Sequence, residues 1–399
     1  MAQVPRVLYI SYDGALEPLG QSQVVAYLER LAADAHITLL SFERSADLAD
    51  RPRVDGMRAR LHAAGVTWLP RRYHKRPPVL STIYDVFVGV RVARAVRADI
   101  VHVRGYVPAL IGLRAKRASG ARVLFDMRGF WVDEKVEAGH WPRGGMLHRA
   151  GKWWERRFLS KADAIVSLTE AGVRELPQLG MRPGMPVQVI PTCADLDRFV
   201  PRTDRARDRS KLVIGYVGTL SNWYLRTETL AYLGWLCRRL PAATVRMVTR
   251  EDHHQLRADA QAAGVPDDRL SIVQAAFEDM PQMMQSMDVG VFFIKRCFSK
   301  RASAATKLAE FLACGVPVVI NDGIGDSGAI VRDNHVGVVV AEPSPEHFDA
   351  TAAPLDALLA DSTVDARCRQ TAERLFSLSD GVAKYAALYQ QLLTRAPVQ

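Results

Sequence analysis

The chain has 399 residues, of which 48% are hydrophobic and 24% are charged. This composition excludes disordered and fibrous proteins, and the length predicts two globular domains. The net charge is +10, which indicates an anionic partner such as nucleic acid, an acidic membrane surface or a phosphorylated substrate.

The sequence shows no signal of export or of a zinc site. No apolar run approaches the roughly 20 residues that span a bilayer, and the first residues, MAQVPRVLYIS, are typical of a strand rather than of a signal peptide. The five cysteines are scattered and form no CxxC pair, so reduced thiols are expected instead of disulfides. These features predict a cytoplasmic protein.

Short apolar runs alternate with stretches of helical spacing along the whole chain. In the first half we expect strands at residues 6–11, 36–42, 98–105, 121–127 and 162–169. A polar stretch at 202–211 is typical of a linker. In the second half we expect strands at residues 212–220, 243–249, 269–276, 288–294, 316–322 and 336–341. Strands that alternate with helices predict an α/β protein with a doubly wound parallel sheet in each half.

The alternation divides the chain into three parts. We expect a Rossmann-like N-terminal domain at residues 1–198, a Rossmann-like C-terminal domain at 199–380, and a closing helix at 381–399 that packs back on the N-terminal domain. Ligands of open α/β sheets bind at the carboxyl ends of the strands, so the chemistry should lie in the loops that follow the strands.

Two glycine-containing loops are candidates for a phosphate site. In DGALEPLGQSQ, Gly20 would let a phosphate approach the start of a helix, although an ordinary turn fits equally well and the NAD fingerprint GxGxxG is absent. In GYVGTLSNWYLRTETL, Gly218 follows a strand and Arg226 could pair with a diphosphate. For at least one of the neighbouring Trp223 and Tyr224, we expect packing in the core instead of a ligand contact.

The stretch RVLFDMRGFWVDE is a strand that ends in polar residues. Its ionisable side chains and one tryptophan suit a polar, sugar-like ligand at a strand end. These residues are Asp126, Arg128, Trp131, Asp133 and Glu134. The alternative is a solvated loop that contains a local ion pair between Asp126 and Arg128.

The stretch FFIKRCFSKRASAATKLAE carries the clearest signal. Between its apolar strand and the helix of Glu310 lie the basic residues Lys295, Arg296, Lys300, Arg301 and Lys307. Because the loop follows a buried strand, its charge should face a cleft, where a diphosphate is the natural counter-charge. Glu310 could accept hydrogen bonds from ribose hydroxyls, or it could be a surface residue that pairs with a neighbouring lysine.

Five segments, in this order, resemble glycosyltransferase family 4 over nearly the whole chain. They are DGALEPLGQSQV, FDMRGFWVDE, VIPTCADLDRF, YVGTLSNWY and ATKLAEFLACGVPVVINDGIGD. The resemblance implies the GT-B fold, in which two Rossmann-like domains face a cleft, the first binding the acceptor and the second the nucleotide sugar. It also implies a retaining transfer from a nucleotide-diphosphate sugar to a glycan or lipid-linked acceptor of a cell-surface polysaccharide, such as lipopolysaccharide or capsule.

The resemblance also implies roles for single residues. Glu310 matches the family's ribose-binding glutamate, whereas Ala302 stands where the family has a second glutamate. The family's basic pair is replaced by GTLSNWYLR, so the phosphate role is expected to fall to Lys300 and Lys307. The expected donor residues are Gly20, Gly218, Thr219, Arg250, Lys300, Lys307, Leu308 and Glu310. The expected acceptor residues are Asp13, Gln21, Trp131, Asp133 and Glu134.

We expect Asp126 and Arg128 to be catalytic. Asp126 could accept a proton from the acceptor hydroxyl, and Arg128 could pair with Asp126 or contact an anionic group of the substrate. No DxD-like carboxylate cluster occurs in a plausible cleft loop, so neither a metal nor another cofactor is expected.

The basic charge leaves other partners open. The regions Arg71–Arg76 and His148–Lys161 suit an anionic membrane surface, which would make the protein peripheral on the inner face of the plasma membrane. A solvated helix face with tryptophans in the core fits the second region equally well. A non-catalytic nucleotide-sugar-binding or scaffold protein is the alternative that Ala302 supports, and nucleic acid is not expected because no recognition motif occurs.

Overall fold

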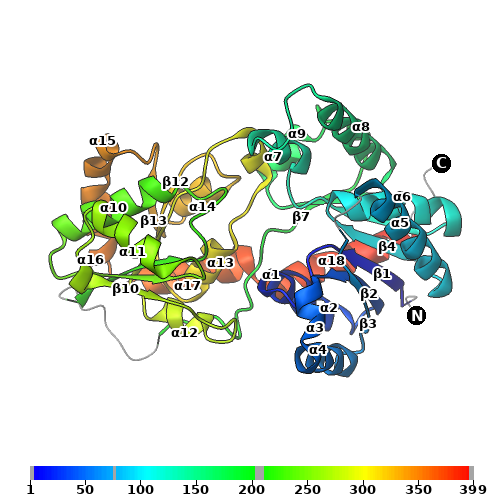
Figure 1. Ribbon diagram of the computed structural model, residues 1–399, viewed down its shortest axis with the longest axis horizontal. Coiled ribbons are helices and arrows are strands. Elements are labelled where there is room, and N and C mark those ends of the chain that lie inside the picture. The colour runs from blue at the N-terminus through cyan, green and yellow to red at the C-terminus, as the bar shows by residue number, and fades with distance from the viewer. Residues whose placement is uncertain (1–3, 75–77, 203–210, 395–399) are drawn as a thin grey trace. The chain divides into compact units, whose positions relative to one another are not determined.

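A computed structural model describes residues 4–74, 78–202 and 211–394 (Figure 1). The chain divides into two compact units, which are Met1–Pro191 together with Leu378–Gln399, and Thr192–Ser377. The sequence places this division at 198/199, and its expected linker at 202–211 lies almost entirely outside the described residues. In the part of the chain that the structure describes, no helix is both long enough and apolar enough to cross a membrane.

The first unit contains a seven-stranded parallel sheet with the order β3-β2-β1-β4-β5-β6-β7. Its strands are β1 (Arg6–Ser11), β2 (His36–Glu43), β3 (Thr67–Arg72), β4 (Ile100–Arg104), β5 (Arg122–Asp126), β6 (Ala164–Ser167) and β7 (Val187–Val189). The order reverses between β1 and β4, so the ends of these two strands are the expected place for a ligand.

The sequence predicts five of these strands and misses two at the sheet edges. The edge strand β3 has the sequence TWLPRR, in which Pro70 and two arginines hide the strand pattern. Arg71 and Arg72 therefore end a strand instead of lying in a charged loop, and residues 75 and 76 of that expected loop lie outside the described residues. The other edge strand, β7, has only three residues.

Helices flank this sheet (Figure 1). They are α1 (Pro18–Gly20), the π-helical turn η1 (Gln21–Val25), α2 (Ala26–Leu31), α3 (Ser45–Ala49), α4 (Arg51–Ala63), α5 (Pro78–Ala95), α6 (Tyr106–Ser119), α7 (Trp131–Glu137), α8 (Met146–Lys161), α9 (Glu170–Glu175) and α18 (Leu378–Thr394). The last of these, α18, belongs to the first unit although it ends the chain. Its Tyr385 packs edge-to-face on Tyr27 of α2, with ring centres 5.8 Å apart.

The second unit contains a six-stranded parallel sheet with the order β10-β9-β8-β11-β12-β13. Its strands are β8 (Val213–Val217), β9 (Thr244–Val248), β10 (Leu270–Val273), β11 (Val289–Phe292), β12 (Val318–Asn321) and β13 (Gly337–Val340). The strands β8, β11 and β12 are almost wholly buried, as expected for a parallel sheet covered on both faces.

The helices of the second unit connect these strands. They are α10 (Arg226–Arg239), α11 (His253–Ala262), η3 (Asp267–Arg269), α12 (Met280–Gln285), η4 (Phe298–Ala302), α13 (Thr306–Ala313), α14 (Ser327–Asp333), α15 (Pro345–Phe348), η5 (Asp349–Thr351), α16 (Ala352–Ala360) and α17 (Val364–Phe376). The core packs Leu308, Phe311 and Leu312 of α13 against the sheet. The predicted fold class, two doubly wound α/β units, is confirmed.

Candidate functional site

The first candidate site lies at the end of β8 in the second unit. Gly218 follows the strand with a φ of 100°, a conformation that glycine adopts without strain. The hydroxyl of Tyr216 donates a hydrogen bond of 2.6 Å to the carbonyl oxygen of Thr219 and so holds the turn. A Cβ atom on Gly218 would lie 3.2 Å from Nζ of Lys307, so the glycine leaves room for the lysine to reach the turn.

Lys307 is a buried cation on the first turn of α13. Its Nζ lies 3.7 Å from the centre of the Tyr224 ring and 4.5 Å from that of Tyr216. Burial lowers the pKa of Lys307 to about 7, although Glu310 one turn later opposes this shift. Two aromatic faces stabilise the ammonium only in part, so an anion placed beside it would raise its pKa again.

Glu310 lies one helical turn after Lys307 and is partly buried. Burial raises the pKa of Glu310 to about 7, while the charges of Lys307 and Arg198 oppose the rise. The alternative of an ordinary surface glutamate does not fit this burial. A carboxyl group in this position can accept hydrogen bonds from hydroxyl groups, as the ribose role requires.

Lys300 is the second buried lysine of this region. It belongs to the 3-10 turn η4, and its Nζ lies 3.8 Å from the centre of the Trp223 ring. Trp223 and Tyr224, at least one of which is expected from the sequence to pack in the core, thus each carry a lysine ammonium on their rings. Lys300 and Lys307 therefore each place a buried ammonium on an aromatic ring, and Trp223 and Tyr224 are adjacent residues of the loop after β8.

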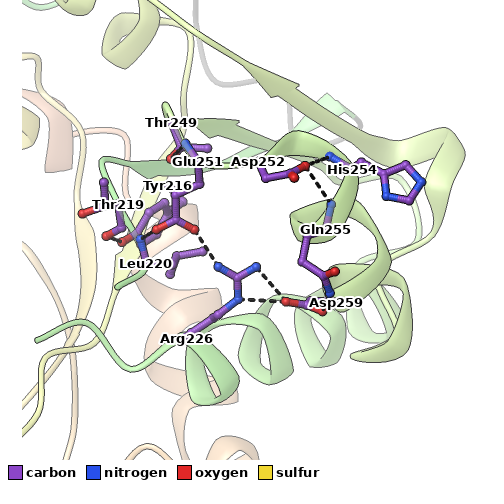
Figure 2. A network of polar contacts seen from close by, with 10 residues as sticks. All are labelled: Tyr216, Thr219, Leu220, Arg226, Thr249, Glu251, Asp252, His254, Gln255 and Asp259. Atoms are coloured by element: carbon purple, nitrogen blue, oxygen red, sulfur yellow. Dashed lines mark hydrogen bonds and ion pairs between the residues drawn. The ribbon is translucent and has the colours of Figure 1, made fainter. Parts of the chain in front are cut away.

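Arg226 does not serve as a free charge partner for a diphosphate, as the sequence suggests it could. Figure 2 shows its guanidinium between two carboxylates: Nη1 donates to Glu251 at 2.6 Å, and Nη2 donates to Asp259 at 2.7 Å. The second oxygen of Glu251 accepts the backbone N–H of Leu220 at 2.6 Å. This loop amide, a candidate for a phosphate contact, is thus occupied by a carboxylate of the chain itself.

The remaining donor candidates of this unit are distributed differently. Thr219 and Arg250 are exposed, in the loops after β8 and β9 respectively. Leu308 packs its side chain in the core, and its N–H donates to the carbonyl oxygen of Ala305 at 3.1 Å. Leu308 therefore supports α13 instead of offering a free contact to a ligand.

Gly20 of the first unit is a packing glycine. A Cβ atom on it would lie 1.8 Å from the carbonyl oxygen of Gly14, so the glycine permits two backbone segments to touch. The nearby amides are also in use, because the carboxylate of Glu43 accepts the N–H groups of Ala15 at 2.9 Å and of Leu16 at 3.3 Å. These contacts favour the ordinary-turn interpretation of Gly20 over a phosphate site.

A second polar cluster lies at the ends of β4 and β5 in the first unit, with Asp126 at its centre. Asp126 is fully buried, and its Oδ2 accepts a hydrogen bond of 3.0 Å from the hydroxyl of Tyr385 on α18. Its carboxylate also lies 3.5 Å from Nη1 of Arg104 and 3.9 Å from Nη1 of Arg128. Burial alone would raise the pKa of Asp126, but Arg128, His102 and Arg104 outweigh it and the pKa lies below its usual value.

Arg128 has an unusual backbone for a residue of its size. Its φ is 58°, and Gly129 follows with a φ of 129°. A left-handed conformation costs about 1–2 kcal/mol at a residue with a Cβ, and such outliers cluster at functional sites. The Arg128 side chain remains 15% exposed, so it can reach a ligand, whereas Asp126 itself is fully buried.

His102 belongs to the Asp126 cluster and is not among the predicted site residues. Its Nδ1 lies 2.7 Å from the hydroxyl of Tyr389, and its Nε2 lies 3.8 Å from Oδ2 of Asp126. Burial lowers the pKa of His102 despite the neighbouring carboxylate, so the ring is neutral at pH 7. The sequence does contain a signal for His102, which is the pattern HVR in β4. There His102 and Arg104 place polar side chains at alternate positions of a buried strand.

The expected acceptor residues lie in two places in the first unit. Asp13 follows β1 and accepts a hydrogen bond of 2.8 Å from Nε of Arg104, which joins it to the Asp126 cluster. Gln21 begins the π-helical turn η1, and its side-chain amide donates to the carbonyl oxygen of Leu16 at 3.4 Å.

The other acceptor candidates are on α7. Trp131 packs against Tyr106 and Trp141, with ring centres 5.7 and 5.2 Å apart. Asp133 pairs with Lys152 of α8, and Glu134 is partly buried on the same helix. Trp131 and Asp133 thus contact neighbouring helices. Among the described residues, no group of three or more histidine, cysteine, aspartate or glutamate side chains is arranged to hold a metal ion.

Comparison with known proteins assigns both halves of the chain. Residues 20–193 match the family model of the glycosyl transferase 4-like domain, and residues 201–375 match that of the glycosyl transferases group 1. A curated relative, D-inositol 3-phosphate glycosyltransferase of Corynebacterium jeikeium (strain K411), is 27% identical over 210 residues. That match covers 45% of this chain and 48% of the relative, so it spans about half the length of each protein.

Solved structures resemble the chain over nearly its whole length. Sucrose-phosphate synthase of Thermosynechococcus elongatus has a TM-score of 0.75 at 16% identity, covering 98% of this chain and 100% of that one. HepE of Anabaena, solved with UDP and glucose, has a TM-score of 0.70 at 15% identity, covering 96% and 99%. WaaG, a glycosyltransferase involved in lipopolysaccharide biosynthesis, has a TM-score of 0.63 at 16% identity, covering 96% and 99%.

The fold is therefore GT-B, the class of two Rossmann-like units that these structures share. The chain belongs to the GT4-like glycosyltransferases, because the two family models together match residues 20–193 and 201–375. The resemblance noted from the sequence motifs is confirmed.

Proposed function

We propose that this protein transfers a sugar from a nucleotide-diphosphate sugar to an acceptor hydroxyl, and that Thr192–Ser377 binds the donor. The observation that carries the proposal is the buried ammonium of Lys307, held between the rings of Tyr216 and Tyr224 beside Gly218. Burial lowers the pKa of the Lys307 side chain to about 7. An anion bound beside this side chain would raise the pKa and so increase its positive charge.

In this proposal Lys307 and Lys300 hold the donor diphosphate. When the sugar leaves, negative charge builds on a phosphate oxygen, and preorganised cations that lie out of water stabilise that charge. The proposal takes UDP as the first nucleotide to test, because HepE, of the same fold, was solved with UDP. Glu310 accepts hydrogen bonds from the ribose hydroxyls.

On the acceptor side we propose that Arg128 contacts an anionic group of the substrate. Asp126 is a positioning residue in this proposal, since its buried carboxylate holds Arg128 and Arg104. The low pKa of Asp126 makes it a weak proton acceptor. A donor phosphate oxygen or a water molecule can then accept the proton of the acceptor hydroxyl.

The finer features of the proposal rest on the family resemblance and, for the metal and the membrane, on the missing DxD-like cluster and the basic regions of the sequence. The sugar configuration is retained, since the acceptor hydroxyl attacks on the face that the diphosphate leaves, and the reaction needs no metal. The acceptor is a glycan or a lipid-linked glycan of a cell-surface polysaccharide. The enzyme is located in the cytoplasm, at the inner face of the plasma membrane, with Arg71–Arg76 and His148–Lys161 toward anionic lipid.

A non-catalytic nucleotide-sugar-binding protein is the second candidate function. The observation in its favour is Ala302, which is fully buried at the end of η4. A methyl group packs there, at the position where the family has a glutamate near the donor sugar. Such a protein would bind a donor without turning it over.

A two-stage experiment tests the proposal. Thermal unfolding is first measured with UDP, GDP, ADP and TDP and with their glucose or mannose conjugates, because a ligand of the folded state raises the melting temperature. The conjugate with the largest shift is then assayed for hydrolysis and for transfer to a lipid extract. Turnover supports the transferase, saturable binding without turnover supports the second candidate, and no shift with any nucleotide contradicts both.

A further inference from the structure

Helix α5 of the first unit carries a row of exposed apolar side chains. We define the apolar stripe as the five residues with the following exposed fractions: Val79 69%, Leu80 65%, Ile83 60%, Tyr84 55% and Phe87 64%. Their spacing of one, three or four residues places them on one face over the first turns of the helix. Contiguous apolar patches of this kind mark interaction sites on soluble proteins.

The opposite face of α5 anchors the helix. A Cβ atom on Gly89 would lie 2.1 Å from the side chain of Ile111 of α6, so the two helices are in close contact there. Ala93 is buried on the same face, one turn further along. The helix therefore already has a packing face, and the apolar stripe is a second, outward face.

The exposed charges of α5 have one sign. The only acidic residue of α5 is Asp85, which is buried and accepts a hydrogen bond of 2.5 Å from the hydroxyl of Tyr12. Arg91 and Arg94 are exposed and continue the outward face toward the end of the helix. Arg71 is a further exposed arginine, in β3, seven residues before the helix in the sequence.

We propose that the apolar stripe is a docking surface for an anionic lipid bilayer. The five apolar side chains would enter the boundary between headgroups and acyl chains, and the flanking arginines would contact lipid phosphates. A second copy of the chain is a poorer occupant, because packing two such faces together would bring their arginines into one interface without counter-charge. This inference deepens the membrane association proposed above by naming the helix that supplies its apolar contact, and it does not depend on the donor site.

Binding to lipid vesicles of defined composition tests this proposal. The full chain is sedimented with vesicles of phosphatidylglycerol and phosphatidylcholine, and separately with phosphatidylcholine alone. We expect binding to the anionic vesicles that weakens as salt increases. The double variant Ile83→Ser/Phe87→Ser should reduce the partition coefficient at least tenfold and leave the unfolding temperature and nucleotide binding unchanged.

Two matched variants locate the surface. Met146→Ser/Leu147→Ser removes two other exposed apolar side chains, 88% and 60% exposed on α8, and should weaken binding less than Ile83→Ser/Phe87→Ser does. Arg91→Glu should weaken binding to anionic vesicles only. Failure of the unaltered chain to bind anionic vesicles overturns the membrane proposal as a whole.

Binding that survives Ile83→Ser/Phe87→Ser and is lost in Met146→Ser/Leu147→Ser transfers the surface to α8. A dimer that dissociates in the α5 variant, without vesicle binding, assigns the apolar stripe to a second copy. Nucleotide binding is measured in the same variants. Unchanged nucleotide binding shows that a loss of vesicle binding is not caused by damage to the proposed donor site.

Discussion

The ammonium nitrogen of Lys307 lies 3.7 Å from the centre of the Tyr224 ring, and the two residues come from α13 and from the loop after β8. This contact joins the two segments of the second unit that carry the motifs of the family. The same ammonium also contacts the ring and the hydroxyl of Tyr216, and Glu310 lies one helical turn away. Such a charge gains most from an anionic ligand.

Replacing this charge should weaken donor binding. Lys307→Met keeps most of the side-chain volume and removes the ammonium, so the core is expected to remain intact. We expect the Kd for a nucleotide-diphosphate sugar to rise about tenfold to a hundredfold, as for a lost charged hydrogen bond. Calorimetry with the nucleotide diphosphate and with the nucleoside separates the contributions, since only the diphosphate should lose affinity.

Lys295→Ala is the matched control for Lys307→Met, because Lys295 is an exposed cation at the start of the same basic stretch. It should leave the Kd within about twofold. Equal losses for diphosphate and nucleoside in Lys307→Met would remove the phosphate role from this lysine.

Donor binding should also depend on pH. Free Lys307 has a pKa of about 7, and a bound diphosphate would raise it, so binding above pH 7 requires the uptake of a proton. The affinity should therefore fall as pH rises from 7 to 9, by up to about tenfold per pH unit. Titrations in buffers of different ionisation heat measure the proton uptake directly, and Lys307→Met should show neither the slope nor the uptake.

The free energy of unfolding should depend on pH through Glu310. Its pKa is raised from 4.5 to about 7 in the folded chain, so between these values the folded state holds more protons than the unfolded state. The stabilisation is therefore present below pH 4.5 and is lost as pH rises toward 7. Glu310→Gln should unfold at a higher temperature than the unaltered chain at pH 8, and the difference should shrink toward pH 5.

Replacing Gly218, at the turn after β8, should lower both the stability of the fold and the affinity for the donor. Gly218→Ala places a Cβ 3.2 Å from Nζ of Lys307 and forces a side chain into a φ of 100°. We expect a loss of about 1–2 kcal/mol in the free energy of unfolding and a larger Kd for the donor. Gly56→Ala is the control, because no described atom lies within 4 Å of its added Cβ and α4 should gain stability from alanine.

The sequence predicted the sheets better than the polar contacts between distant segments. Strand runs such as VFF and VVI are apolar and β-branched or aromatic, so burial on both faces of a parallel sheet is visible locally. The edge strand β3 is hidden, because Pro70 and the two arginines are tolerated only where one side of the strand is open. Local pattern thus identifies the central strands and fails at an edge.

For the candidate site, the sequence singled out the two lysines and Glu310 but did not predict what surrounds them. Trp223 and Tyr224 are typical of core packing, and nothing local indicates that their faces hold ammonium groups. The partners of Arg226, which are Glu251 and Asp259, lie 25 and 33 residues away, so its ion pairs could not be predicted from the local pattern. The contact of Gly20 with Gly14 depends on how the turn closes, so the local pattern left the phosphate site and the ordinary turn equally open.

The Asp126 cluster shows the same limit more strongly. The hydrogen bond from Tyr385 to Asp126 spans 259 residues, and the contact between Tyr389 and His102 spans 287. Both depend on α18 returning to the first unit. The sequence predicted that return as a helix packing back, but it could not predict which hydroxyl would reach which strand.

The last prediction separates a positioning role of Asp126 from a role in proton transfer. Asp126→Asn keeps the shape and removes a buried charge that faces Arg104 and Arg128. Arg104 keeps its ion pair with Asp13, so the variant should cost about 1.5–3 kcal/mol in the free energy of unfolding, as for a lost hydrogen bond to a charged group. Tyr385→Phe removes one hydrogen bond and leaves the charges, so it should cost about 1–2 kcal/mol.

Transfer assays on the folded fraction of each variant complete this test. If Asp126 only positions Arg128, Asp126→Asn and Arg128→Ala should lower kcat/KM by similar factors, and the pH profile should keep its shape, because no titrating base has been removed. If Asp126 accepts the acceptor proton, Asp126→Asn should lose about 10²-fold or more and Arg128→Ala much less, with the acidic limb of the profile abolished. We expect the first outcome, since a carboxylate whose pKa is held down by Arg128, His102 and Arg104 has little affinity for a proton at pH 7.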